Sequence, residues 1–453
     1  MKHLTPQIIA EVTGGRYVGS ESSRHCRVAG AVRDNRDVKP GNLFVCIRGA
    51  RADGHDFAGS AFEYGAACCL AERAIPEAKG PYVLVDSTLE SIKTLGAYHR
   101  LRFDIPIIGI TGSVGKTTSK EMIAAALGAK FRVLKTLENL NNELGVPLML
   151  LSLDERHEAA VIEMGISDFG EMGRLARMVR PDIFVITIIG YSHLKELGDL
   201  NGVLKAKTEA FAFMDPQGVA VVNGDDDLLW GFDPGMRKIT YGFMPRNDFR
   251  GENVRNEGTD ASMCDIASPA GRYTVRIPAY GSHLAHAALS AAVIGNLLGV
   301  TDEEICSGVL SYAPVGSRAK VTDTGHITLI DDCYNSNPNS VMAALESLST
   351  LPARRVAILG DMLNLGSDSD RMHFESGAYA ARSGIDSLIC CGEKAALIYD
   401  GYISAGGKAA RHFQTKPELT ASLPGLIEKG DAVLVKASNS MKFDEIAQAV
   451  RNL

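Results

Sequence analysis

The chain contains 453 residues, of which 45% are hydrophobic and 22% are charged, a composition typical of folded proteins. One ordinary core does not hold this length, so we expect two or three domains. The 47 basic and 54 acidic residues give a formal net charge of -7, which argues against a nucleic-acid-binding surface. The start lacks the apolar core of a secretory signal, and no segment approaches about 18 uninterrupted apolar residues. We therefore expect no membrane insertion and a cytoplasmic location.

The nine cysteines include two adjacent pairs, Cys68–Cys69 and Cys390–Cys391, which lie in apolar runs. No CxxC spacing suited to zinc is present. The pattern predicts reduced, packed thiols.

Residues 1–103 combine short strand-like runs, such as 42–47 and 81–85, with glycine-rich turns and short helical patterns. This mixture predicts a small α/β domain at the N-terminus.

From Ile105 onward, apolar strands alternate with longer amphipathic helices, and the strands lack the polar alternation of an exposed sheet. This texture predicts a parallel-sheet domain over 104–314. Its clearest strands are 107–110, 159–163, 183–187 and 219–223. An antiparallel segment is expected over 232–276, before a helix that begins near His283.

A boundary near 314–318 precedes a second alternation of strands and helices. The strands are expected at 326–330, 355–359, 387–390 and 432–435, each followed by a helical segment. Residues 315–453 are therefore predicted to form a third domain, doubly wound and Rossmann-like.

A phosphate-binding loop is predicted where the strand 107–110 leads into a helical pattern through Gly-Lys-Thr. Gly112 and Gly115 allow backbone N–H groups to face a phosphate, Lys116 can bridge the β and γ phosphates of ATP, and the Thr117 hydroxyl can bind Mg²⁺. Ile110 stands where the general pattern has its first glycine. The predicted loop consists of Thr111, Gly112, Ser113, Val114, Gly115, Lys116, Thr117 and Thr118.

This loop resembles the shortened phosphate loop of the Mur ligases and of their folylpolyglutamate synthase relatives. The resemblance covers essentially the whole chain, and the motif 331–338, Asp-Asp-Cys-Tyr-Asn-Ser-Asn-Pro, is the most discriminating part of it. That motif, with 360–363 and His373 after it, is similar to the branch of the family that adds D-alanyl-D-alanine to UDP-N-acetylmuramoyl-tripeptide. Further matching segments are 139–147, 163–165, 193–194 and 205–209.

Glu163 ends an apolar strand, and His193 follows the next one, so both are expected at the carboxyl edge of the sheet, where ligands of open α/β folds bind. The resemblance implies that Thr117 and Glu163 bind a first Mg²⁺ and that His193 binds a second. It also implies that Lys207 is carbamylated by CO₂, which changes its charge from +1 to -1 and makes it a metal ligand. Lys205 is the competing assignment.

The resemblance implies roles for residues outside the phosphate loop as well. Contacts with the nucleotide are expected from His286, Arg318 and Asp332. Contacts with the acceptor or the incoming amine are expected from Asp34, Asn35, Arg36, Asn141, Asn142, Tyr334, Asn335 and Asn337. Arg36 and Arg48 are basic groups suited to a pyrophosphate.

The implied chemistry activates a carboxylate as an acyl phosphate, with ATP and Mg²⁺, and joins it to an amine. UDP-N-acetylmuramoyl-tripeptide and D-Ala-D-Ala are the expected substrates, and the protein is expected to be a monomer. Two departures bear on specificity: His286 replaces an asparagine on the adenine side, and 436–439 reads Lys-Ala-Ser-Asn where Lys-Gly-Ser-Arg is common.

Two alternatives stay open. One is another ligase of the superfamily, acting on a different UDP-muramyl peptide or on folate, although the motif 331–338 argues against it. The other is a nucleotide-dependent switch or motor, which hydrolyses ATP without joining two substrates.

Overall fold

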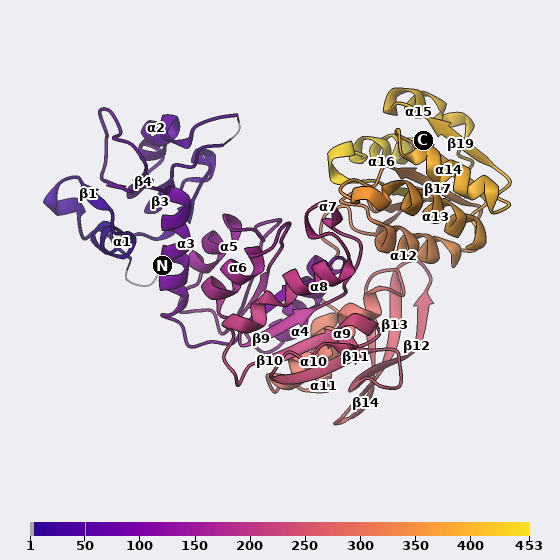
Figure 1. Ribbon diagram of the computed structural model, residues 1–453, viewed down its shortest axis with the longest axis horizontal. Coiled ribbons are helices and arrows are strands. Elements are labelled where there is room, and N and C mark those ends of the chain that lie inside the picture. Colours follow the sequence, from indigo (N-terminus) through magenta and orange to yellow (C-terminus); the bar gives the residue numbers. More distant parts are fainter. Residues whose placement is uncertain (1–3, 50) are drawn as a thin grey trace.

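Three β-sheets, each with its own helices, are arranged in chain order in the computed structural model, which describes residues 4–49 and 51–453. Figure 1 shows the first and third regions on opposite sides of the molecule, with the second region between and below them. The predicted α/β class with three sheet-containing regions is confirmed. Among the described residues, no helix is long and apolar enough to cross a membrane.

The first region contains a five-stranded sheet in the order β1-β5-β4-β3-β2, with β1 antiparallel to β5 and the other pairs parallel. Its strands are β1 (Arg16–Val18), β2 (Gly30–Val32), β3 (Asn42–Val45), β4 (Cys68–Ala71) and β5 (Tyr82–Leu84). Its helices are α1 (Pro6–Thr13), α2 (Ala58–Glu63), α3 (Thr88–Arg100), η1 (Glu21–Ser23), η2 (Asn35–Asp37) and η3 (Gly54–Phe57).

Helix α3 of the first region packs against the second region. The His99 ring donates a hydrogen bond from Nε2 to the carbonyl of Leu153 over 2.9 Å, and the Arg100 guanidinium donates to the carbonyl of Val179 over 3.0 Å. Both side chains are buried. The first region is therefore joined to the second by buried polar contacts that need their partners.

The second region contains a nine-stranded sheet in the order β14-β13-β12-β11-β10-β9-β6-β8-β7. Its strands are β6 (Ile107–Thr111), β7 (Val133–Lys135), β8 (Ala159–Glu163), β9 (Ile183–Ile186), β10 (Val219–Asn223), β11 (Arg237–Gly242), β12 (Phe249–Glu257), β13 (Ala261–Ser268) and β14 (Gly271–Ile277). Its helices are α4 (Lys116–Gly128), α5 (Gly145–Leu151), α6 (Glu171–Val179), α7 (Leu194–Leu197), α8 (Leu200–Thr208), α9 (Asp227–Gly231), α10 (Leu284–Leu297), α11 (Asp302–Val309) and η4 (Glu209–Phe213).

The four predicted strands of this sheet are confirmed, but the prediction of an antiparallel segment over 232–276 is wrong at its start. Strand β11 pairs in parallel with β10, and β12 begins in parallel with β11; only β12, β13 and β14 are antiparallel. The short helix α9 supplies the crossover that a parallel connection requires. Buried Ile239 and Tyr241 extend the apolar face of the sheet across β11.

Helix α4, which follows the predicted phosphate loop, packs against the sheet and against α10. Its residues Met122, Ile123 and Leu127 are fully buried and share one apolar cluster with α10, including Ala288 and Ala291. Small alanine side chains let the two helices approach closely. The phosphate loop is thus anchored at both ends, by β6 and by α4.

The third region contains a six-stranded sheet in the order β15-β16-β20-β17-β18-β19, parallel except for β15. Apolar clusters on both faces, one with α12 to α14 and one with α15 and α16, confirm the doubly wound prediction. Its strands are β15 (Lys320–Asp323), β16 (Thr328–Asp331), β17 (Arg355–Gly360), β18 (Ser387–Cys391), β19 (Ala410–Phe413) and β20 (Ala432–Lys436). Its helices are α12 (Pro338–Ser349), α13 (Ser369–Arg382), α14 (Ala395–Ser404), α15 (Lys416–Ser422), α16 (Asp444–Arg451), η5 (Gly366–Asp368), η6 (Leu423–Gly425) and η7 (Asn439–Met441).

All nine cysteines are free thiols, and both adjacent pairs are buried, as the sequence predicted.

Candidate active site

The predicted phosphate loop connects the end of β6 to the first residue of α4, Lys116. Gly112 has φ +148° and Gly115 has φ +82°, a backbone region that favours glycine. A Cβ on Gly112 would lie 1.9 Å from the Thr187 hydroxyl oxygen, which itself donates to the carbonyl of Val114 over 2.5 Å. Both the backbone angle and the neighbouring side chain therefore require glycine at position 112.

Lys116 folds back over its own loop, and its ammonium donates to the carbonyl of Gly112 over 2.7 Å. Burial lowers the pKa of Lys116, the nearby charge of Arg318 lowers it further, and the charge of Glu163 acts in the opposite direction. The ammonium therefore lies among charged groups of both the second and third regions. A phosphate in this loop would replace the Gly112 carbonyl as the partner of Lys116.

Glu163 is buried at the carboxyl end of β8 and faces the phosphate loop. Its carboxylate accepts a hydrogen bond from the Thr117 hydroxyl over 2.8 Å and another from the Asn141 amide over 2.9 Å. Its backbone N–H donates to the Thr136 hydroxyl over 2.8 Å. The structure thus brings together Thr117 and Glu163, the two oxygen donors predicted for the first Mg²⁺.

The loop after β9 lies against the phosphate loop and leads to His193. The Ser113 hydroxyl donates to the carbonyl of Gly190 over 2.9 Å and receives a hydrogen bond from the Ser192 hydroxyl over 3.0 Å. Burial lowers the pKa of the His193 imidazole, and the charges of Lys207 and Lys116 lower it further. A neutral imidazole is the form that binds a metal.

The two candidate lysines of α8 lie in opposite environments. Lys207 is 2% exposed, and no carboxylate or carbonyl among the described residues accepts a hydrogen bond from its ammonium. Burial, followed by the charge of Lys116, lowers the pKa of Lys207 well below its usual value. Lys205 is exposed, with its ammonium 5.8 Å from the centre of the Phe169 ring.

The third region contributes an arginine and a tyrosine to the same neighbourhood. The Arg318 guanidinium carbon lies 3.7 Å from the centre of the Tyr334 ring, a cation–π geometry. Burial raises the pKa of Tyr334, the charge of Arg318 lowers it, and the charge of Glu163 raises it. Tyr334 is therefore within electrostatic range of the Glu163 carboxylate at the edge of the second sheet.

Three family models match the chain in order: the Mur ligase family catalytic domain at residues 27–100, the Mur ligase middle domain at 110–295, and the Mur ligase glutamate ligase domain at 317–439. Two curated relatives are named UDP-N-acetylmuramoyl-tripeptide–D-alanyl-D-alanine ligase. The one from Bacillus subtilis is 35% identical over 98% of this chain and 97% of its own length. The one from Escherichia coli is 32% identical over 100% and 99%.

The chain belongs to the Mur ligase family.

Solved structures agree with this assignment. A crystal structure of MurF from Acinetobacter baumannii is 28% identical, covers 99% of both chains and superposes with a TM-score of 0.89. MurF from Thermotoga maritima in complex with ADP is 26% identical, covers 94% of this chain and 97% of its own, and has a TM-score of 0.83.

Asp332 of this Mur ligase has protein partners for both carboxylate oxygens. Lys436, which is 2% exposed, donates to Asp332 over 2.6 Å and to the carbonyl of Asn335 over 2.9 Å. The N–H of Ala319 donates to the other oxygen of Asp332 over 3.0 Å. Asn439 donates to the carbonyl of Tyr334 over 3.1 Å. The altered segment 436–439 therefore holds the motif 331–338 in place.

Two predicted substrate-binding asparagines have hydrogen-bond partners within the protein. The Asn337 side chain caps α12 and accepts from the N–H of Ser340 over 2.9 Å. The Asn142 side chain accepts from the N–H of Gly145 over 2.9 Å, at the start of α5. The Asn-Pro sequence that begins α12 is the signal that identifies the cap at Asn337. Asn335 is exposed and Asn141 contacts Glu163.

His286, predicted near adenine, is paired with Asp225 over 3.1 Å, and its ring packs edge-on against Phe243. Burial raises the pKa of Asp225, but hydrogen bonds from His286 and from the N–H groups of Met244 and Phe243 outweigh it, so the pKa is lowered. The sequence does not predict a role for Asp225, because its partner His286 is 61 residues away and no local motif connects the two.

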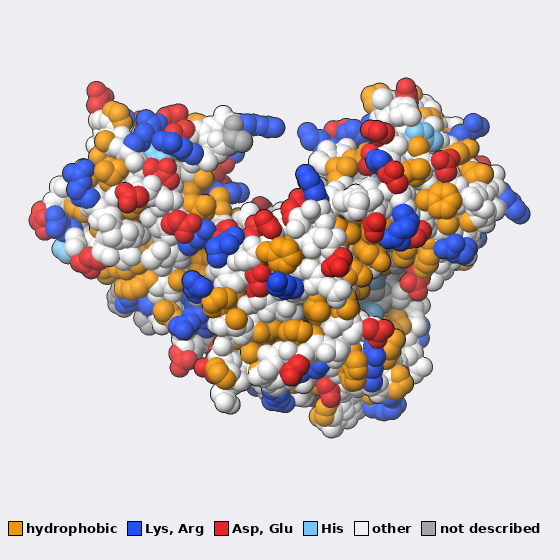
Figure 2. Space-filling model, viewed as in Figure 1, with side chains coloured by type: hydrophobic (Ala, Val, Ile, Leu, Met, Phe, Trp, Pro, Cys, Tyr) orange, Lys and Arg blue, Asp and Glu red, His pale blue; other side chains and the backbone are white. Residues whose placement is uncertain are grey.

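The predicted residues of the first region form a separate group. Asp34 accepts from the Arg36 guanidinium, with the Nη2 contact at 2.5 Å, and the Arg36 hydrogen bonds lower the pKa of Asp34 to about 2. The Asn35 amide donates to the Ser60 hydroxyl over 3.1 Å. Figure 2 shows a hollow between the first and third regions, with basic side chains on both sides. The structure does not bring Asp34, Asn35 and Arg36 to the phosphate loop.

Proposed function

We propose that this chain joins D-alanyl-D-alanine to UDP-N-acetylmuramoyl-tripeptide, with conversion of ATP to ADP and phosphate, in the synthesis of peptidoglycan precursors. The observation that carries the proposal is the convergence of three elements: the phosphate loop with Lys116, the Thr117–Glu163 pair, and the Arg318–Tyr334 pair from the third region. Full-length relatives with the corresponding name support the choice of substrates.

In the proposed reaction, an oxygen of the tripeptide carboxylate attacks the γ-phosphorus, and the bond to the β-phosphate oxygen breaks to release ADP. The amine of D-Ala-D-Ala then attacks the acyl carbon, phosphate leaves, and the amine loses a proton. Lys116 would neutralise charge that develops on the γ-phosphate. Closure of the third region would exclude water, which would otherwise hydrolyse the acyl phosphate.

No single cluster of described side chains near the phosphate loop would hold magnesium, so its ligands would have to come from several elements. Within residues 4–49 and 51–453, no three His, Cys, Asp or Glu side chains cluster closely enough to hold a metal. Thr117 and Glu163 would hold one Mg²⁺, and His193 with a carbamylated Lys207 would complete the sites. Bound Mg²⁺ would offset the phosphate charge and align the γ-phosphate. Carbamylation needs a neutral amine, and Lys207 is buried with no hydrogen-bond acceptor for its ammonium among the described residues, which favours the neutral form.

We assign the acceptor to residues 1–103, ATP to 104–314 and the incoming amine to 315–453. Arg36 and Arg48 would face the pyrophosphate of the acceptor, and His286 would face adenine. We further propose that the enzyme is a monomer that acts in the cytoplasm on these water-soluble substrates.

A product screen tests the proposed substrates. The enzyme is incubated with ATP, Mg²⁺ and UDP-N-acetylmuramoyl-tripeptide, together with D-Ala-D-Ala or with single amino acids. The products are identified by their mass in mass spectrometry. We expect the UDP-linked pentapeptide and one ADP per product, and no product from single amino acids. Product formed with a single amino acid but not with D-Ala-D-Ala would be consistent with a ligase and would refute D-Ala-D-Ala as the incoming amine.

A further inference from the structure

The loop that carries His193 is in contact with the third region just before the histidine. Asn339, in the first turn of α12, accepts a hydrogen bond from the N–H of Tyr191 over 3.1 Å. A Cβ on Gly190 would lie 2.6 Å from the same Asn339 oxygen. The backbone two residues before His193 therefore lies directly against α12.

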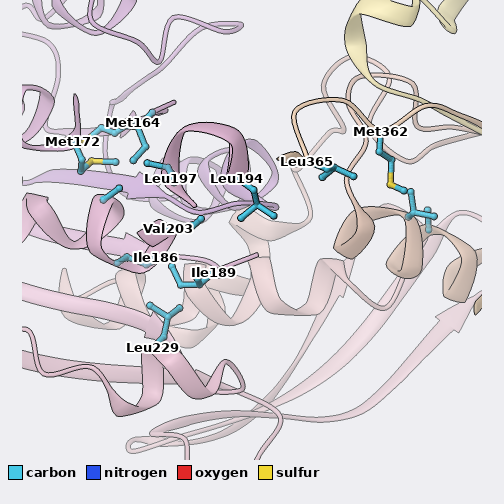
Figure 3. Close-up of a cluster of buried hydrophobic side chains, with 14 of the residues drawn as sticks. Met164, Met172, Ile186, Ile189, Leu194, Leu197, Val203, Leu229, Met362 and Leu365 are labelled. Carbon is cyan, nitrogen blue, oxygen red and sulfur yellow. The ribbon is translucent and has the colours of Figure 1, made fainter. Parts of the chain in front are cut away.

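A second contact from the third region follows the histidine immediately. A Cβ on Gly366 would lie 3.4 Å from the backbone nitrogen of Lys195 and 3.5 Å from the carbonyl carbon of Leu194. The side chains of Leu194 and Leu365 are 7% and 2% exposed and belong to one apolar cluster. Figure 3 shows them facing each other across the boundary between the two regions, with Met362 behind Leu365.

The backbone of His193 has a φ of +54°, in the left-handed region that disfavours a residue with a side chain. Helix α7, which it precedes, has only four residues. On the other side, Ser192 is tied to the phosphate loop through Ser113. The segments on both sides of His193 are therefore held by contacts, some of which come from Asn339, Leu365 and Gly366 of the third region.

We propose that Asn339, Leu365 and Gly366 are positioning residues that hold the His193 imidazole at the phosphate loop when the third region is docked. The inference rests on the proposed function, in which His193 binds a metal. The inference implies that docking of the third region strengthens metal binding at His193 and that metal binding in turn favours docking. The hydrogen bond to Tyr191 and the apolar contact at Leu194 act on the two sides of one residue.

Manganese binding measures this effect without catalysis. Mn²⁺ is titrated into the full-length enzyme with a non-hydrolysable ATP analogue, and free Mn²⁺ is measured by electron paramagnetic resonance. Asn339→Ala loses one hydrogen bond. We expect it to raise the dissociation constant for Mn²⁺ about fivefold at the lower-affinity sites, to which we assign His193. Gly366→Ala should act in the same direction, because its φ of +65° disfavours a side chain and relief of that strain would shift the backbone that contacts Leu194 and Lys195. His193→Ala provides the reference for complete loss of those sites.

Two control variants separate local positioning from general damage. Gly325 has φ +78°, and a Cβ at this position would have no atom within 4 Å, so Gly325→Ala adds the same backbone strain away from the second region. Tyr280→Phe removes the hydroxyl that is hydrogen-bonded to the carbonyl of Ser347 over 3.0 Å and to the Thr350 hydroxyl, contacts that join the same two regions away from His193. We expect Mn²⁺ affinity in both controls to stay within about twofold of the wild type.

Unchanged Mn²⁺ binding in Asn339→Ala and Gly366→Ala, with folded protein by circular dichroism, would overturn the inference. An equal loss in Tyr280→Phe would also overturn it, because general docking would then suffice. Either result would leave the proposed function intact if the wild type still forms the pentapeptide. Absence of that product would refute the proposed function instead.

Discussion

At the scale of single residues, Lys207 is the side chain whose environment is hardest to explain as structure alone. It is almost completely buried, and the charge that acts on it most strongly is the positive charge of Lys116. Burying an unpaired ammonium is costly, and the cost is relieved when the amine is neutral or carries a negative carbamate. The exposed Lys205, two positions earlier, gains nothing from such a change.

We predict that Lys207→Ala lowers the rate of ligation by at least about 100-fold, because a ligand is lost from the metal that would neutralise charge at the phosphate. Lys205→Ala is the matched control on the same helix and should keep the wild-type rate. Rates are measured as ADP release with both substrates present. Short carboxylic acids should partly restore Lys207→Ala, and an inactive Lys205→Ala beside a normal Lys207→Ala would reverse the assignment.

The lowered pKa of Lys207 also predicts a dependence on CO₂ and on pH. A lysine whose folded-state pKa is below its usual value keeps more neutral amine near neutral pH, and acidification through that pKa protonates the amine. Enzyme prepared in CO₂-free buffer should have low activity that bicarbonate restores, less completely as the pH falls. Activity that ignores bicarbonate at every pH would contradict a carbamate.

At the scale of elements, the beginning of α12 combines stability with placement of the site. Asn337 caps this helix through a reciprocal pair with Ser340, Pro338 occupies its first turn, and Asn339 follows. The cap therefore fixes the direction in which the motif 331–338 enters the helix. Thr415 forms an equivalent capping box at α15, far from the phosphate loop in sequence and on the other face of the third sheet.

We predict that Asn337→Ala and Thr415→Ala each lower the free energy of unfolding by about 1 kcal/mol, the usual cost of a lost N-cap. Urea unfolding followed by circular dichroism measures this. Only Asn337→Ala should also raise KM for the incoming amine. If Asn337→Ala changes KM without any loss of stability, Asn337 contacts the substrate directly, as the sequence-based hypothesis held.

The sequence predicted the elements better than it predicted their partners. The apolar runs of β6, β8, β9 and β10 are long and continuous, so their burial in a parallel sheet is visible in one dimension. Strand β11 was assigned to an antiparallel segment because its own residues do not reveal which neighbour it pairs with. Likewise, the Gly-Lys-Thr run identifies the phosphate loop locally, whereas the pairing of Lys436 with Asp332 joins residues 104 positions apart.

At the scale of the whole molecule, the parts assigned to acceptor and nucleotide lie on separate regions. The pair Asp34–Arg36 lies in the first region, and the phosphate loop lies in the second region, which Figure 1 shows between and below the first and third regions. An acceptor that spans the hollow would bring its carboxylate to Lys116, and closure of the third region would then cover it. The central claim of this account is that the acceptor carboxylate itself attacks the γ-phosphate.

Oxygen-isotope transfer tests that claim most directly. UDP-N-acetylmuramoyl-tripeptide labelled with ¹⁸O in its terminal carboxylate is converted with ATP, Mg²⁺ and D-Ala-D-Ala, and the released phosphate is analysed by mass spectrometry. Activation as an acyl phosphate predicts one ¹⁸O atom in each phosphate released, and none without the dipeptide beyond slow hydrolysis. Phosphate that carries oxygen only from ATP and water, while the pentapeptide still forms, would contradict the account.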